Sequence, residues 1–150
     1  MNNIKKNDLI NYLKKVDFSF PIPLSRKVDL DEYADKLLEK ATLCCEYKEN
    51  ELVGLVAGYT DNLVNNLAYI ALVGVTENAQ HQGIASGLVK EFCKVCNNKK
   101  IYKVHLYTDA TNIKAIRMYK KLGFEEFLIE NESRPQDIHF ILNIKNKKKR

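Results

Sequence analysis

The sequence predicts an α/β (α+β) fold in which a mixed β-sheet of about six to seven strands is flanked by about four helices. Short apolar runs with strand-like composition alternate with longer segments whose apolar residues recur every three or four positions, as on one face of a helix. Two helical segments lie between strands, which implies right-handed crossovers and parallel pairing. The chain of 150 residues fits one domain, expected at 1–144, followed by a basic tail at 145–150.

Two helices are expected near the N-terminus. Apolar residues within 4–16 recur with helical period, and the pattern ends before the interruption at Pro21-Ile22-Pro23. A second apolar stripe covers 30–38, where Asp29 is placed as N-cap and Glu32 as its capping-box partner.

Three strands are expected next. Residues 43–47 and 52–59 flank the polar pair Glu49-Asn50, which predicts a hairpin. Residues 67–75 are almost continuously apolar, which predicts a central strand covered on both faces.

The remaining elements follow from the same patterns. Helices are expected at 83–97 and at 112–122, the latter ended by Gly123, with a strand at 101–107 between them. The last two strands, 124–129 and 138–144, are close enough in sequence to form a hairpin.

Charge and composition exclude several classes of protein. The net charge is +5, but the tail alone carries five positive side chains, so the basic character describes a solvated tail and does not require a nucleic-acid-binding face. No apolar run approaches the roughly 20 residues of a membrane span, and no secretory signal follows Met1, so a cytoplasmic protein is expected.

Cysteines and histidines predict no metal site. Cys44 and Cys45 are adjacent and point to opposite faces of a strand, and Cys93 and Cys96 share the apolar face of a helix, so they are interpreted as core residues. The histidines His105 and His139, on separate strands, are expected to be structural and are not a metal pair by spacing.

The segment 73–88 carries the strongest chemical signal, because it passes from a strand through a glycine-containing turn into a helix. A helix N-terminus offers unpaired N–H groups and a positive dipole end to a phosphate. The small residues Gly83, Ala85 and Gly87 allow close approach, and Ser86 adds a hydroxyl. The segment matches neither a P-loop nor the three-glycine dinucleotide motif.

Two motifs carry a resemblance to a known family. Gln80-x-x-Gly83-x-Ala85 resembles the signature of the GNAT superfamily N-acetyltransferases, and Asn112-x-x-Ala115-x-x-x-Tyr119-x-x-x-Gly123-Phe124 is similar to their later helix and following strand. The resemblance covers about 52–143. It implies a centrally splayed sheet, with acetyl-CoA as acyl donor and no metal.

The resemblance also implies residue roles. Backbone groups of Val73 and Val75 would bind the pantetheine arm, backbone amides of the turn would hold the pyrophosphate, and Lys114 would reach the adenosine phosphates. Tyr119 would be the general acid, since a phenol of ordinary pKa near 10 is protonated at neutral pH; the alternative is a core tyrosine packed on Ile116 and Leu122. The expected cofactor-binding residues are Val73, Gly74, Val75, Gln80, His81, Gln82, Gly83, Ile84, Ala85, Ser86, Asn112 and Ala115.

The acceptor and the general base stay open. Loop 18–25 and the second helix are expected to form one wall of the acceptor site, with Tyr47, Tyr59 and Tyr107 as candidate lining residues. Tyr69 could order a water, whereas Glu77 and His81 are interpreted as solvated loop residues.

The favoured function is acetyl transfer to a primary amine of a small molecule by direct attack in a ternary complex. The alternatives are a catalytically silent acyl-CoA-binding module and an acetyltransferase for a protein or RNA-associated acceptor that uses the tail. The sequence is compatible with a monomer or a homodimer, and it does not indicate which acyl chain the enzyme prefers.

Overall fold

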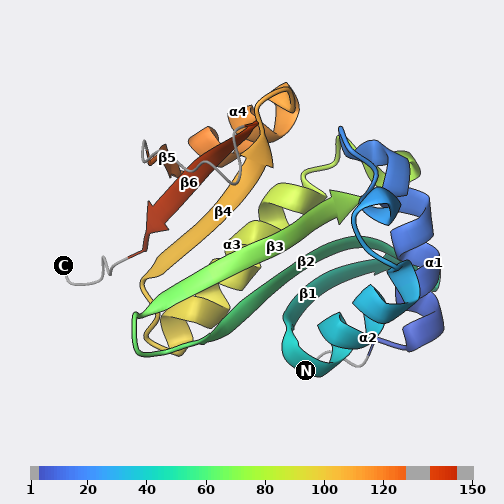
Figure 1. The fold of residues 1–150 in the computed structure, drawn as a ribbon, viewed down its shortest axis with the longest axis horizontal. Coiled ribbons are helices and arrows are strands. Elements are labelled where there is room, and N and C mark those ends of the chain that lie inside the picture. The colour runs from blue at the N-terminus through green and yellow to red at the C-terminus, as the bar shows by residue number, and fades with distance from the viewer. Residues whose placement is uncertain (1–3, 128–135, 145–150) are drawn as a thin grey trace.

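The computed structural model describes residues 4–127 and 136–144. This part of the chain contains four α-helices and six strands, arranged as in Figure 1, and no helix in it is long and apolar enough to cross a membrane. The α-helices are α1 (Lys6–Val16), α2 (Leu30–Lys40), α3 (Ile84–Asn98) and α4 (Ile113–Lys121). The strands are β1 (Thr42–Lys48), β2 (Glu51–Asn62), β3 (Leu67–Val75), β4 (Lys103–Asp109), β5 (Glu125–Glu126) and β6 (Asp137–Asn143). Short 3₁₀ helices are η1 (Asp17–Ser19), η2 (Leu24–Arg26) and η3 (Glu77–Ala79).

The strands form one mixed sheet in the order β1-β2-β3-β4-β6-β5. Only β3 and β4 pair in parallel, and all other neighbours are antiparallel. The predicted α/β class is therefore confirmed. The expected strand 124–129 is shorter in the described chain, where only Glu125–Glu126 pairs with β6, and positions 128 and 129 lie outside the described residues, as does the predicted basic tail.

The sheet opens between its two central strands, as the predicted splay requires. β3 and β4 pair only from Leu67↔Lys103 to Tyr69↔His105, after which each strand continues without the other (Figure 1). The register of β2 and β3 also shifts here, because Ala57 faces Leu72 while Gly58 faces Ile70. Ala71 is thus an extra residue on β3, and such a bulge increases local bending and twist.

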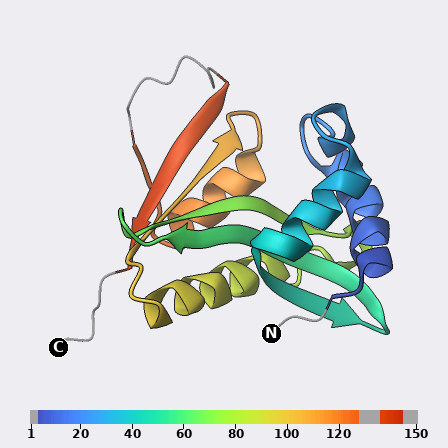
Figure 2. The ribbon, with the colours of Figure 1, turned by 60° about the horizontal axis from the view of Figure 1, so that its bottom comes forward.

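Two hydrophobic cores lie on opposite faces of the sheet (Figure 2). One packs α3 and α4 against the strands, and the other packs α1 and α2. Cys44 belongs to the first core and Cys45 packs on the second, so the predicted opposite orientation is confirmed. Cys96 is fully buried on α3, with Cys93 packed beside it, as expected for core residues.

Local signals explain the element boundaries. Asp29 caps α2 by accepting hydrogen bonds from the N–H groups of Asp31 and Glu32, at 2.9 and 3.1 Å. Glu49 and Asn50 both adopt positive φ, as the predicted tight hairpin turn requires.

Two strand predictions need correction. β3 is central, but it is not covered on both faces: buried residues alternate with half-buried ones along most of it, because its other face borders a cavity. The strand with both faces buried is β2. The strand expected at 101–107 runs from Lys103 to Asp109, since the Tyr102 N–H donates instead to the Asn66 side chain, at 2.7 Å.

Candidate active site

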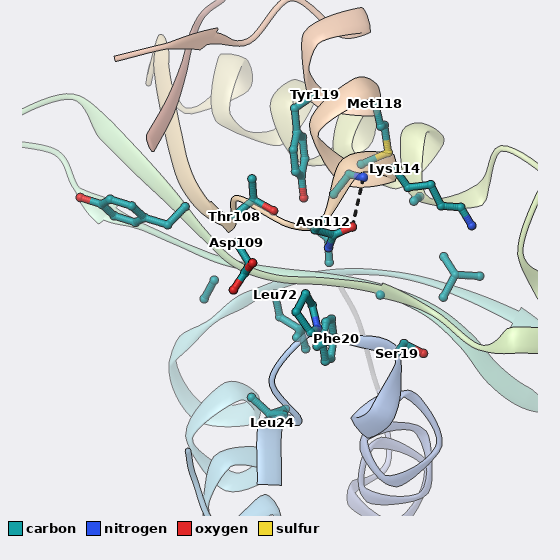
Figure 3. A pocket seen from close by; sticks show the side chains of 18 of the residues that line it. Ser19, Phe20, Leu24, Leu72, Thr108, Asp109, Asn112, Lys114, Met118 and Tyr119 are labelled. Atoms are coloured by element: carbon teal, nitrogen blue, oxygen red, sulfur yellow. Dashed lines mark hydrogen bonds between the residues drawn. The ribbon is translucent and has the colours of Figure 1, made fainter. Parts of the chain in front are cut away.

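A large cavity of about 1730 Å³ occupies the opening between β3 and β4. Its walls come from β3, the N-terminal turn of α3, α4, and the segment that joins α1 to α2. Figure 3 shows Tyr119, Met118 and Asn112 on one side of this cavity, with Phe20, Leu24 and Leu72 on the other. Elements far apart in the sequence thus meet at one site.

The edge of β3 that faces the cavity has no strand partner beyond Tyr69. A free strand edge presents N–H and C=O groups that can pair with the amides of an extended ligand. One carbonyl near the end of this edge is already used, because Gln80 Nε2 donates to the Val75 carbonyl at 3.1 Å; the Gly74 carbonyl, which faces β2, accepts from Tyr12 at 2.5 Å. The Gln80 hydrogen bond therefore links the turn before α3 to the end of β3.

The N-terminal turn of α3 forms an anion-binding geometry. Gly83 is the N-cap with φ of 77°, and no side chain caps the helix. The first helical hydrogen bond runs from the Gly87 N–H to the Gly83 carbonyl, at 3.0 Å, so the amides before Gly87 are available to a ligand. Four of the basic side chains that line the cavity come from α3 and α4: Lys90, Lys114, Arg117 and Lys121. A free strand edge, uncapped amides and these cations together fit a diphosphate joined to an amide-containing arm.

Two residues of the predicted turn do not line the cavity. Gln82 is exposed and accepts a hydrogen bond from Lys48 Nζ at 2.5 Å. Gly87 also lies off the wall, and a Cβ atom there would meet nothing within 4 Å. All the other expected cofactor-binding residues line the cavity: Val73, Gly74, Val75, Gln80, His81, Gly83, Ile84, Ala85, Ser86, Asn112 and Ala115.

Tyr119 combines a core position with access to the cavity. Its ring packs against Phe124 and Phe140, with centroid distances of 5.5 and 5.8 Å, and the residue is only 5% exposed. Burial raises the pKa of its hydroxyl well above the ordinary value, which keeps the group protonated. Figure 3 shows this hydroxyl pointing from α4 into the cavity. The helix itself begins at Asn112, whose Oδ1 accepts from the Ala115 N–H at 3.3 Å.

The opposite end of the cavity has an aromatic and polar lining. The segment between α1 and α2 contributes one wall, and it is held by the buried Asp17, which accepts hydrogen bonds from Ser25 N and Oγ at 2.7 and 2.6 Å. Tyr47, a candidate for this lining, lies elsewhere and donates to Asp8 at 3.0 Å. The aromatic side chains on the wall are Phe20, Tyr33, Tyr59, Tyr69 and Tyr107.

Two tyrosine hydroxyls at this end stay protonated at neutral pH and so cannot accept a proton. Burial raises the pKa of Tyr33 to about 12 and also raises that of Tyr59. Glu77 lies off the cavity wall, whereas His81 lines it near α3.

His105 and His139 lie next to each other across β4 and β6, with Nδ1 and Nε2 2.9 Å apart. Their rings contact Tyr69 and Tyr107, at centroid distances of 5.0 and 4.4 Å for the nearest pairs. Linear spacing could not reveal this pair, because it depends on strand register. In the described chain, no group of three or more His, Cys, Asp or Glu side chains could hold a metal ion.

Several polar cavity residues were not expected. Lys27, Lys36, Asp109 and Asp137 all line the cavity. One signal could have found Asp109, because it ends a strand that pairs in parallel, where ligands often bind.

Comparisons with known proteins agree with this architecture. The sequence model described as the acetyltransferase (GNAT) family matches residues 9–124. A mycothiol acetyltransferase of Arthrobacter sp. (strain FB24) is 40% identical over 55 residues, which is 37% of this chain and 17% of that protein. The match therefore spans about a sixth of that relative.

Solved structures share the fold over nearly the whole chain. A PaiA N-acetyltransferase of Thermoplasma acidophilum, in complex with coenzyme A, has a TM-score of 0.76 at 14% identity and covers 95% of this chain and 96% of that one. The ribosomal-protein-S18-alanine N-acetyltransferase of Escherichia coli has a TM-score of 0.76 at 15% identity, covering 99% and 94% of the two chains.

Proposed function

The chain belongs to the GNAT acetyltransferase family, and we propose that it transfers an acetyl group from acetyl-CoA to a primary amine of a small molecule by direct attack in a ternary complex. One observation carries this proposal: the cavity between β3 and β4 joins the uncapped N-terminus of α3 to the hydroxyl of Tyr119. The first feature suits the donor's phosphates, and the second suits the departing thiolate.

The donor's position follows from the groups on each wall. The diphosphate would bind the first-turn amides of α3, with the four basic side chains of α3 and α4 on the same cavity. The pantetheine arm would pair with the free edge of β3 near Val73, and an amide of this edge would polarise the thioester carbonyl. Acetyl-CoA supplies the activated acyl group, whose carbonyl carbon is the electrophile.

The protein's own contribution to the reaction is positioning and proton transfer. The neutral amine forms the new C–N bond as the C–S bond breaks, and the Tyr119 hydroxyl donates its proton to the thiolate sulfur. The proton lost by the amine passes to water, and the Tyr119 phenolate regains a proton from water before the next turnover. The Tyr119 hydroxyl is protonated at neutral pH, as this role requires, while burial raises its pKa and makes it a weaker acid in the resting protein.

The names of similar proteins support more than one acceptor class. One relative is named for mycothiol and one structural neighbour for the alanine of a ribosomal protein. The acceptor end is a concave site with Tyr33, Tyr59 and Tyr69 on its walls, which favours a small molecule.

Thiol release from acetyl-CoA, measured against a panel of small amines and peptides, tests the proposal. Release stimulated by at least one small amine, with N-acetylated product identified by mass spectrometry, is the expected result. Acetyl-CoA binding without release for any amine or peptide would favour a silent binding module. Release with peptides alone would favour a protein acceptor.

A further inference from the structure

The acceptor end of the cavity carries opposite charges on facing walls. Asp109 and Asp137 are the acidic side chains among the described residues that line the cavity, and they face each other across β4 and β6. Lys27 lines the same cavity from the segment between α1 and α2. Figure 3 shows the Asp109 carboxylate pointing into the cavity on the same side as Asn112 and Tyr119.

Asp109 has one carboxylate oxygen fixed and one available. Its Oδ1 accepts hydrogen bonds from Thr111 N at 2.8 Å and from Thr111 Oγ1 at 2.6 Å. Its Oδ2 accepts none from the described residues. The hydrogen bonds from Thr111 and the charge of Lys27 lower the pKa of Asp109, so it stays ionised and is a weak base. It is suited to bind a cation and not to remove a proton.

Lys27 and Asp109 interact electrostatically but form no ion pair in the part of the chain that the structure describes. The charge of Lys27 contributes to the lowered pKa of Asp109, yet the ion pairs found among residues 4–127 and 136–144 do not include these two side chains. The backbone of Lys27 is held by its N–H, which donates to the Leu24 carbonyl at 2.8 Å, and by the neighbouring Asp17–Ser25 hydrogen bonds, whereas its side chain is exposed. A cation and an anion that line the same cavity without pairing fit a ligand that carries both charges.

We propose that the acceptor is a small zwitterion, an amine that also carries a carboxylate as an α-amino acid does, with Asp109 binding its ammonium group and Lys27 its carboxylate. This inference rests on the proposed function and specifies its acceptor class. An amine reaches the enzyme mainly as an ammonium ion, and Asp109 would hold that ion at the Tyr119 end of the cavity. Loss of one proton to water then leaves the neutral nitrogen close to the acyl carbon.

The test compares L-amino acids with their amides and with the amines that lack the carboxylate, using acetyl-CoA and the full chain. We expect kcat/KM for the preferred amino acid to exceed that for its amide by about tenfold, the value of one charge-assisted contact. Lys27→Met should remove this preference by lowering kcat/KM for the amino acid to the value for its amide. Asp109→Asn should lower kcat/KM for both, because the asparagine Oδ1 can still accept from Thr111 while the charge is lost.

Lys40→Met is the matched control, since Lys40 is an exposed lysine of α2 that does not line the cavity. Equal or better turnover of amides, free amines or peptides would overturn the zwitterion proposal and leave the acetyltransferase proposal standing, as would a preference that survives Lys27→Met. Calorimetric binding of amino acids to the protein with CoA gives a readout without turnover. If no amine is acetylated, binding that Lys27→Met weakens still supports this site, and binding that it leaves unchanged rejects it.

Discussion

The Tyr12 hydroxyl on α1 donates a hydrogen bond to the Gly74 carbonyl on β3, at 2.5 Å. Tyr12 is almost fully buried, and a Cβ atom on Gly74 would lie only 2.7 Å from its oxygen. This contact joins the N-terminal helix to β3 on the side of the strand that pairs with β2, so it links the packing of α1 to the strand whose opposite edge borders the cavity.

Tyr12→Phe should lower the free energy of unfolding by about 1–2 kcal/mol, because a buried carbonyl loses its partner. The KM for acetyl-CoA should rise as the edge of β3 loosens. Urea unfolding and steady-state kinetics measure the two effects. Tyr47→Phe, which removes a hydrogen bond between exposed groups, is the control and should change neither.

Gly74→Ala should be destabilising by about 1–3 kcal/mol, since the new methyl group meets the Tyr12 oxygen. In the Tyr12→Phe background that oxygen is gone, so the cost of Gly74→Ala should fall. A double-mutant cycle gives the coupling energy. Additive effects would show that the two residues do not interact in solution.

Tyr119→Phe should lower kcat by about 10²–10⁴-fold if the hydroxyl is the general acid. The KM for acetyl-CoA should change little, because the phenylalanine ring can keep the contacts with Phe124 and Phe140. Because burial raises the pKa of Tyr119 above the ordinary tyrosine value of about 10, ionisation of this residue should not lower the wild-type kcat up to about pH 10. An unchanged kcat in the variant would remove Tyr119 from the mechanism.

Much of the fold follows from local patterns in the sequence. Asp29 caps the predicted helix, the Glu49-Asn50 pair makes the predicted turn, and the central position of β3 follows from its apolar run. These features depend on residues close together in the chain, so periodicity and turn chemistry suffice to find them. The opening of the sheet between β3 and β4 was expected only from the family resemblance.

The acceptor end could not be predicted in the same way. The distance between Lys27 and Asp109, and the contact between His105 and His139, depend on how distant segments pack and on strand register. The bulge at Ala71 likewise has no signature in its own sequence, because it arises from pairing with β2.

Asp17→Ala should loosen the acceptor wall without touching the donor site. The buried Asp17 carboxylate accepts two hydrogen bonds from Ser25, and hydrogen bonds to charged groups contribute about 1.5–3 kcal/mol. We expect the KM for the amine to rise several-fold and the KM for acetyl-CoA to stay unchanged. Ser25→Ala, which removes only the hydroxyl contact, should give a smaller change in the same direction. Equal changes in both KM values would mean that the segment supports the whole cavity.

Two glycine substitutions should have opposite effects on stability. A Cβ atom at Gly58 would lie 2.5 Å from the Phe92 ring and 2.7 Å from the Tyr69 carbonyl, so Gly58→Ala should cost about 1–3 kcal/mol. Gly87 is exposed on α3 with open space around it, so Gly87→Ala should stabilise by about 0.5–1 kcal/mol. Urea unfolding measures both, and a loss of acetyl-CoA affinity in Gly87→Ala would show that this glycine contacts the donor.

Alkaline pH should destabilise the protein through its buried thiols. Burial raises the pKa of Cys44 and Cys96 to about 12 and that of Cys93 to about 11, whereas an unfolded cysteine titrates near 8.5. A folded pKa above the unfolded one means that the stabilisation is complete below about pH 8.5 and is lost as the pH rises toward the folded values.

The free energy of unfolding should therefore fall between about pH 8.5 and 11, because only the unfolded chain releases these protons in that range. Urea titrations at several pH values measure the slope, and alkylation gives an independent readout. At pH 8 the buried thiols of the folded protein should react far more slowly with iodoacetamide than those of the urea-unfolded chain, since the thiolate is the reactive form. Equal alkylation rates in the two states would mean that the α3 core opens readily, and the pH effect should then be absent as well.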